Sequence, residues 1–286
     1  MKNDLAAYVS RIEKYLQSCF LSSEPQQVLF DAMRYSLLAG GKRLRPVMTL
    51  AFCELCGGTR EQALPFAAGI EMIQTYSLIH DDLPCMDNDD FRRGKPTNHR
   101  VYGEATAVLA GDALLTAAFG ELVKAELPAS RIVEAVRVLS ACAGELGMVG
   151  GQVLDMEAET RACTEAEVYA IQSRKTGALI SAACQLGVVA AGGSAAQQEQ
   201  AAAYARSLGL AFQIQDDILD VIGDAGKLGK ATGMDQNKNT FVRIFGIDAC
   251  RKMVQEETEK AVRALSGFDQ PEFLTALARS LINREY

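Results

Sequence analysis

Two aspartate-rich segments hold the side chains of this sequence that are best suited to chemistry. Each contains three aspartates within a turn or two of backbone: Asp81, Asp82 and Asp87 in the first, and Asp216, Asp217 and Asp220 in the second. Carboxylates this close repel one another, so a fold that keeps them together usually recruits a cation. Oxygen donors without paired His or Cys indicate a hard ion such as Mg²⁺, which binds carboxylates together with substrate phosphates. Two such segments facing each other could hold several Mg²⁺ ions around one diphosphate.

The second segment has the spacing of a binding site inside a helix. Asp216 and Asp220 are four residues apart and therefore share one helical face, and Gln213 lies one turn earlier on the same side. The flanking residues 208–214 and 218–222 are too apolar for a surface helix. Because acids within an apolar helix are costly unless their charge is compensated, the pattern favours a functional site over a solvated acidic patch.

The first segment needs a break in its helix to form a site. Asp81 and Asp87 are six residues apart, which places them about 240° apart on an unbroken helix. Pro84 should end or bend the helix and let Asp87 turn back. His80 is interpreted as a hydrogen-bonding neighbour of the carboxylates, and the only other histidine, His99, offers no partner for a zinc site.

The elements that position these segments are predicted to be helices almost throughout. Apolar residues recur at helical intervals over residues 3–20, 66–80, 104–124, 130–146, 165–190, 197–222, 247–265 and 271–283. Glycines are expected to separate helices at 40–41, 57–58, 94–96, 150–151 and 192–193. The alternating pattern of short strands is absent. We expect residues 1–286 to form a single all-α domain of about ten helices.

Charge and cysteine usage exclude several classes of protein. A net charge of −7 argues against a general nucleic-acid binder, although basic residues cluster at 42–45 and 92–95. The eight cysteines are scattered, and the one close pair, Cys53 and Cys56, has no second pair at zinc spacing. The N-terminus lacks a signal sequence, and no apolar run is judged to reach membrane-spanning length. We therefore expect a soluble cytoplasmic protein that binds neither nucleic acid nor membrane.

Five motifs, taken together and in order, resemble those of one enzyme family. They are GGKRLRP at 40–46, DDLPCMDNDDFRRGKPTNH at 81–99, Gly-Asp at 111–112, Lys-Thr-Gly at 175–177 and FQIQDDILD at 212–220. The set resembles a short-chain trans-isoprenyl diphosphate synthase, and most closely the bacterial farnesyl diphosphate synthase (geranyltranstransferase) type. The matching motifs extend from about residue 35 to 243, in the order found in the family.

This resemblance implies a helical fold around a deep central cavity, usually a homodimer, with Mg²⁺ as cofactor. It implies that isopentenyl diphosphate is condensed with dimethylallyl or geranyl diphosphate. The six aspartates named above would then form two walls of a Mg²⁺ site for the allylic diphosphate, with further contacts from Arg92, Lys175, Thr176, Gln213 and Lys230. The isopentenyl diphosphate pocket would be formed by Gly41, Lys42, Arg45 and Arg93.

The chemistry explains why these residue types are needed. Breaking the allylic carbon–oxygen bond leaves a diphosphate of growing charge, which Mg²⁺, Lys and Arg stabilise. The resulting cation must be kept from water in an apolar shaft. The isopentenyl double bond attacks it, a proton is lost, and the resemblance implies that a diphosphate oxygen accepts that proton. No Ser, Cys or His nucleophile is required.

The helix before the first segment carries one departure from the family. Gln74 stands where the family usually has His, and it shares a helical face with Ser77 and Asp81. Gln can donate a hydrogen bond to phosphate but cannot become cationic. We therefore expect weaker or less pH-dependent binding of isopentenyl diphosphate without loss of function.

Product length is predicted to be fifteen carbons. Each added five-carbon unit gains roughly 4 kcal/mol on burial, so only a steric floor can stop growth. The resemblance puts that floor at Tyr76 and Ser77, and a bulky Tyr suits the shorter farnesyl chain. Tyr76 lies about 140° from Asp81 on the helical wheel, which also fits a purely structural core residue. The DDLPCMDNDD string resembles plant-type geranylgeranyl diphosphate synthases too, which makes the twenty-carbon product the alternative.

Three other functions are compatible with parts of the sequence. A class I terpene cyclase also uses aspartate-rich metal sites, but it would not need the Lys42, Arg45 and Arg93 set. A non-catalytic regulatory subunit of a heteromeric synthase would be expected to have lost acids from one segment, and both segments are intact. A metal-dependent phosphohydrolase would need a positioned general base, for which there is no candidate.

Overall fold

The computed structural model describes residues 2–222 and 239–282, and it confirms the predicted all-α class. Two long helices dominate the described part, α4 (Arg60–Asp81) and α11 (Ala195–Ile222). The other helices, in chain order, are α1 (Lys2–Gln17), α2 (Gln27–Leu37), α3 (Leu44–Leu55), α5 (Asn98–Tyr102), α6 (Glu104–Leu122), α7 (Ala129–Ala143), α8 (Met148–Ala158), α9 (Glu165–Gln172), the π-helical turn η1 (Ser173–Gly177), α10 (Ala178–Ala191), α13 (Phe241–Phe245), α14 (Ile247–Ala264) and α15 (Glu272–Ile282).

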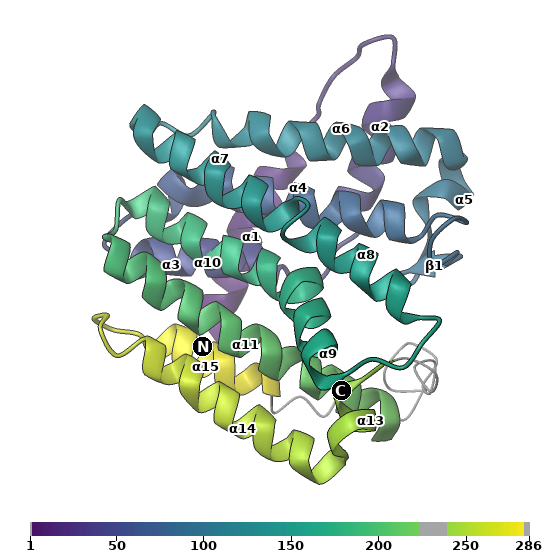
Figure 1. Ribbon diagram of the computed structural model, residues 1–286. Helices are drawn as coiled ribbons and strands as arrows, with labels where there is room; N and C mark the ends of the chain where they lie inside the picture. The colour runs from purple at the N-terminus through teal and green to yellow at the C-terminus, as the bar shows by residue number, and fades with distance from the viewer. Residues whose placement is uncertain (1, 223–238, 283–286) are drawn as a thin grey trace.

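The helices form one domain with α4 and α10 at its centre (Figure 1). Helix α4 packs against α3, α6 and α10, and α10 packs in turn against α3, α7 and α11. Helices α14 and α15 lie along α11 at one end of the molecule, while α6 and α7 lie at the other. The two aspartate-rich segments lie at the ends of α4 and α11. They therefore belong to the same packed domain although they are distant in sequence.

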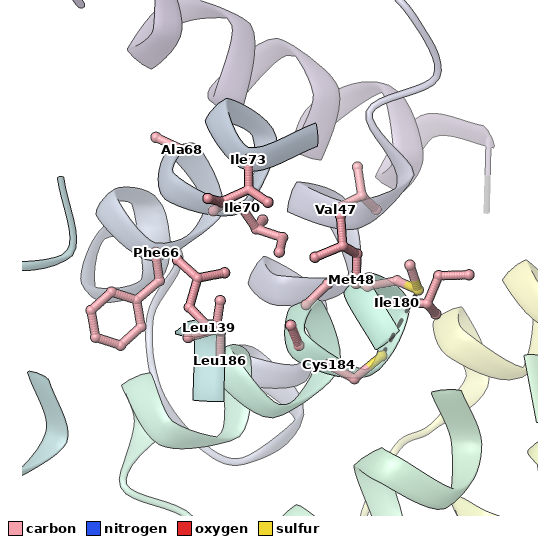
Figure 2. Packing of buried hydrophobic residues seen from close by; sticks show 14 of the residues in the cluster. Val47, Met48, Phe66, Ala68, Ile70, Ile73, Leu139, Ile180, Cys184 and Leu186 are labelled. Atoms are coloured by element: carbon pink, nitrogen blue, oxygen red, sulfur yellow. Dashed lines mark hydrogen bonds between the residues drawn. The ribbon is translucent and has the colours of Figure 1, made fainter. Parts of the chain in front are cut away.

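The core between these helices is built from small and branched apolar residues (Figure 2). Val47 and Met48 of α3 face Ile70 and Ile73 of α4, and the Met48 sulfur lies 3.9 Å from that of Cys184 on α10. All of these side chains are buried. Removing a large apolar side chain from such a core typically costs about 2–5 kcal/mol, so this packing fixes the relative position of α3, α4 and α10.

Two features differ from the elements expected from sequence. A short antiparallel hairpin pairs β1 (Phe91–Arg92) with β2 (Lys95–Pro96), where only a loop was predicted. The predicted break at Gly150 and Gly151 is wrong, because both glycines lie inside α8. An added Cβ at Gly151 would come within 2.2 Å of the Lys175 backbone nitrogen, so this glycine serves close helix packing and does not end a helix.

Helix α6 is, within the described residues, the one helix that is long and apolar enough to cross a membrane by length and composition alone. The helix packs against α4 and α2, and 39% of the apolar stretch is buried. These contacts place one side of α6 in the core of the domain.

Candidate active site

The first aspartate-rich segment folds back on itself at the end of α4. The helix ends at Asp81, shortly before Pro84, which lacks the backbone amide that a continuing helix would need. The Asp87 amide then donates to the Asp81 carbonyl at 2.8 Å, which returns Asp87 to the helix end. Burial and the charge of Asp87 raise the pKa of Asp81 against the opposing effect of Lys175. The predicted return of Asp87 is confirmed, and the pair is a site of concentrated negative charge.

The second aspartate of this segment has a different environment. Asp82 is buried, with 4% of its surface exposed, and its Oδ1 accepts a hydrogen bond from Arg92 Nε at 2.6 Å. Burial raises the pKa of Asp82 to about 6, although the Arg92 charge opposes that shift. Arg92 also contacts Asp89 at 3.3 Å, so two carboxylates hold its guanidinium at the end of α4.

The second segment, on α11, also has a buried aspartate beside more accessible ones. Asp217 is buried, and its Oδ2 accepts a hydrogen bond from the Phe241 amide at 2.8 Å, at the start of α13. Asp216 and Asp220 are only partly buried, one turn apart on the same helical face. In both segments the middle aspartate is buried, while its neighbours stay partly accessible.

The π-helical turn η1 brings the predicted Lys-Thr pair to α11. Thr176 Oγ1 donates to Gln213 Oε1 at 3.2 Å, which joins two residues that the sequence assigned to one substrate. Lys175 Nζ lies 2.5 Å from Asp155 Oδ2 of α8, and its charge lowers the pKa of Asp81. Asp155 was missed by sequence reasoning, because nothing in the local pattern of α8 marks it. Lys230, predicted for the same substrate, lies outside the described residues.

The predicted second anion pocket surrounds the loop between α2 and α3. Arg93 donates to the Gly40 carbonyl, and its guanidinium lies so close to Gly41 that an added Cβ would meet Arg93 Cζ at 2.8 Å. Arg45 Nε is buried without a hydrogen-bond partner among the described residues. Burial lowers the pKa of Arg45, and the nearby Arg93 charge adds to this effect. Lys42 is exposed on the same loop. An orphaned buried guanidinium nitrogen beside a second arginine fits an anionic ligand.

Arg43 holds this loop in place and was not predicted to matter. The Arg43 side chain is fully buried, and the residue adopts a left-handed backbone conformation (φ 49°). It contacts Glu13 of α1 at 2.6 Å, Glu71 of α4 at 2.5 Å and the Leu37 carbonyl at the end of α2 at 2.7 Å. One guanidinium therefore ties three helices to the loop. The sequence offered no sign of this role, because the partners are distant along the chain.

His80 ties the end of α4 to α6. Its Nε2 donates to the Val108 carbonyl at 3.0 Å and lies 3.9 Å from Asp112 Oδ1. The ring lies against Gly111, where an added Cβ would come within 2.0 Å of Nε2. The expected role of His80 as a hydrogen-bonding neighbour fits this geometry. The Gly-Asp motif at 111–112 leaves room for the His80 ring at Gly111 and places the Asp112 carboxylate near it.

The remaining predicted residues lie on α4, one to two turns before the first aspartate-rich segment. Gln74 and Ser77 are partly buried, and Ser77 Oγ donates to the Gln74 carbonyl at 3.0 Å. Tyr76 is 6% exposed, and its ring meets His80 edge-on at 5.8 Å between centroids. Burial raises the pKa of Tyr76 to about 12, and the Asp81 charge adds to the shift. The Tyr76 hydroxyl is thus within electrostatic reach of the first wall, despite the 140° wheel angle.

The aspartates fit a Mg²⁺ site in which substrate phosphates supply the remaining ligands. Among the described residues no three Asp, Glu, His or Cys side chains are grouped closely enough to form a metal cage on their own. The accessible carboxylates are instead divided between α4 and α11. Mg²⁺ is usually bound by one or two carboxylates together with substrate phosphates, so divided carboxylates are compatible with it. Asp81, Asp87, Asp216 and Asp220 would hold the ions from their two sides.

Comparison with known proteins identifies the family. Residues 26–276 match the polyprenyl synthetase family. The chloroplastic geranylgeranyl pyrophosphate synthase of Capsicum annuum is 46% identical over 90% of this chain and 71% of its own length. The heterodimeric geranylgeranyl pyrophosphate synthase large subunit 1 of Arabidopsis thaliana is 45% identical over 96% of this chain and 76% of its own length.

Solved structures agree with this result. The apo structure of an FPP/GFPP synthase from Zymomonas mobilis superposes with a TM-score of 0.89 at 36% identity, and the match covers 99% of this chain and 100% of that one. The fold and the sequence thus lead to one assignment: this chain belongs to the polyprenyl synthetase family and is a prenyltransferase.

Proposed function

We propose that this enzyme condenses isopentenyl diphosphate with dimethylallyl and then geranyl diphosphate to give farnesyl diphosphate. The observation that carries the proposal is two separate regions of the described structure, each lined by charged and polar side chains suited to bind a diphosphate. One lies between Asp81 and the Lys175–Thr176–Gln213 group, and the other holds Arg45 and Arg93 beside Gly41. Two sites are what a reaction between two diphosphates needs, and a cyclase or a hydrolase would use only one.

The residues of the first site would divide the work of ionisation. Bound Mg²⁺ would neutralise the diphosphate as its charge grows. Arg92, held by Asp82, and Lys175, held by Asp155, would donate to the same oxygens. Thr176 and Gln213 would direct oxygen lone pairs toward the allylic cation. Removing one well-aimed donor of this kind typically costs about 3–4 kcal/mol of transition-state stabilisation.

The second site would hold isopentenyl diphosphate chiefly by charge. Lys42, Arg45 and Arg93 would bind its diphosphate, and Gly41 would let the backbone approach. Gln74 would offer a neutral hydrogen bond in place of the cation that His supplies elsewhere in the family. Because this substrate keeps its diphosphate, its pocket affects binding of substrate and transition state alike.

The farnesyl product is proposed from Tyr76. This buried ring lies one helical turn before His80 and within electrostatic reach of Asp81, which supports a place beside the growing chain, with Ser77 next to it. A second candidate, geranylgeranyl diphosphate, is supported by the names of the plant relatives. Chromatography of the products from dimethylallyl and isopentenyl diphosphates separates the two. A fifteen-carbon product that lengthens to twenty carbons in Tyr76→Ala supports the proposal, and a twenty-carbon product from the unmutated enzyme overturns it.

We propose further that the enzyme acts as a homodimer in the cytoplasm. Helix α6 exposes a stripe at Ala105, Leu109, Thr116 and Gly120, and Leu109 is 58% exposed. This spacing of three to four residues forms one helical face, interrupted only by Asp112. A largely uncharged, small-residue face suits close packing against a second copy, and the name of the Arabidopsis relative describes association of two subunits. All eight cysteines are free thiols, which suits a reducing compartment.

A further inference from the structure

Helix α8 and the turn η1 touch at the level of their backbones. At Gly151 an added Cβ would lie 2.2 Å from the Lys175 nitrogen and 2.7 Å from its Cα. Any side chain at position 151 would push the two elements apart. The contact therefore fixes the backbone of Lys175 relative to α8.

The side chain of Lys175 is fixed from the same helix. Asp155 is four residues after Gly151, so both lie on one face of α8. Its Oδ2 lies 2.5 Å from Lys175 Nζ, and both side chains are 32% exposed. Lys175 is thus held at its backbone by Gly151 and at its ammonium by Asp155.

The ammonium lies toward the reacting end of the site. Its positive charge lowers the pKa of Asp81, so it is within reach of the first wall, and the adjacent Thr176 contacts Gln213 of α11. An ion pair this exposed contributes little to fold stability. A lysine side chain nevertheless has four rotatable bonds, and a partner that restricts them before substrate arrives reduces the cost of reaching the transition state.

We propose that Asp155 is a positioning residue that holds the Lys175 ammonium where the allylic diphosphate departs. The inference rests on the proposed function and deepens it. Asp155 acts only through Lys175 and takes no part in binding isopentenyl diphosphate. Asp155→Asn keeps the shape but loses the charge, and it should lower kcat between roughly ten- and a hundredfold while the KM for isopentenyl diphosphate stays constant.

A double-mutant cycle tests the proposal. Asp155→Asn, Lys175→Gln and the double variant are assayed with radiolabelled isopentenyl diphosphate, with Glu157→Gln, an exposed acid on the same helix, as control. We expect Asp155→Asn to lower kcat in the parent and to have no further effect in the Lys175→Gln background. The control should equal the parent, and all melting temperatures should agree within a few degrees.

Two outcomes would overturn the inference. Equal losses in both backgrounds would show that Asp155 acts independently of Lys175. A higher Mg²⁺ requirement for Asp155→Asn in the Lys175→Gln background would make Asp155 a metal ligand. Both results differ from failure of the proposed function, in which the parent enzyme itself would not elongate an allylic diphosphate.

Discussion

Adjacent aspartates in each acidic segment have different physical situations. Asp82 and Asp217 are buried and hydrogen-bonded by protein groups, whereas Asp81 and Asp216 are partly accessible. A buried carboxylate is less able to reach an incoming ion than a partly accessible one. The sequence predicts metal binding by all six aspartates, and from their burial we propose that the middle residue of each segment chiefly positions its neighbours.

Replacing an accessible aspartate should separate activity from stability. Asp81→Ala or Asp216→Ala is expected to lower turnover by at least a hundredfold at saturating Mg²⁺. The ligand-free melting temperature of Asp81→Ala should stay equal or rise, since burial and Asp87 raise the pKa of Asp81 and its charge therefore destabilises the fold. Calorimetry and a chain-elongation assay measure the two effects. Near-normal turnover in either variant would exclude the two-wall site.

Asp82 should make stability depend on pH. Its folded pKa of about 6 lies above the ordinary value of 3.8, so the folded state binds this proton more tightly. Stability is therefore lost as pH rises from about 4 to 6, by roughly 3 kcal/mol for this group. Asp82→Asn should flatten that decline in denaturant unfolding and be more stable than the parent at pH 7. Asp248→Asn, at a fully solvated position, is the control and should follow the parent at every pH.

Adjacent arginines should produce different kinetic defects. Arg93 lies over Gly41, while Arg92 is held by Asp82. Arg93→Ala should raise the KM for isopentenyl diphosphate by roughly ten- to a hundredfold and affect the allylic KM less. Arg92→Ala should mainly lower kcat, because its diphosphate gains charge in the transition state. Steady-state kinetics with each substrate varied in turn decide this, and identical defects would refute the assignment of two pockets.

At the scale of elements, local signals predicted most of the helices. The 3.6-residue periodicity gave the long helices α4, α6, α11 and α14, and Pro84 gave the end of α4. The failures have a common cause. Gly151 was predicted to break a helix because Lys175, which it contacts in space, is 24 residues away in sequence. Arg43 could not be distinguished from Lys42 and Arg45 because its partners, Glu13 and Glu71, are distant in sequence. Contacts of this range are properties of packing and leave no trace in a sequence window.

The Arg43 cluster should be a stability determinant of the loop between α2 and α3. Glu71→Gln removes the charge of a buried partner and should destabilise the enzyme by about 3 kcal/mol. Glu13→Gln is the matched control, because Glu13 is 27% exposed and water can compensate for the loss. Denaturant unfolding at pH 7 compares the two. Equal destabilisation would mean that Arg43 depends no more on its buried partner Glu71 than on the partly exposed Glu13.

At the scale of the whole molecule, the exposed stripe on α6 should set the oligomeric state. Leu109→Glu places a charge on the proposed contact between two copies and should give a monomer. Light scattering after size-exclusion chromatography measures the mass directly. Leu21→Glu, at another exposed leucine outside α6, in the segment between α1 and α2, should remain dimeric. A parent enzyme that is monomeric at micromolar concentration would contradict the proposal.

Helix α6 has an inner side as well as this outer one. Through its Val108 carbonyl and Gly111 it holds His80, which directly precedes Asp81. A second copy that covers the outer side would therefore steady the wall on which the allylic diphosphate ionises. The turnover number per chain would then depend on the enzyme concentration. On dilution, the rate of prenyl transfer would fall faster than the enzyme concentration and approach second order in chains.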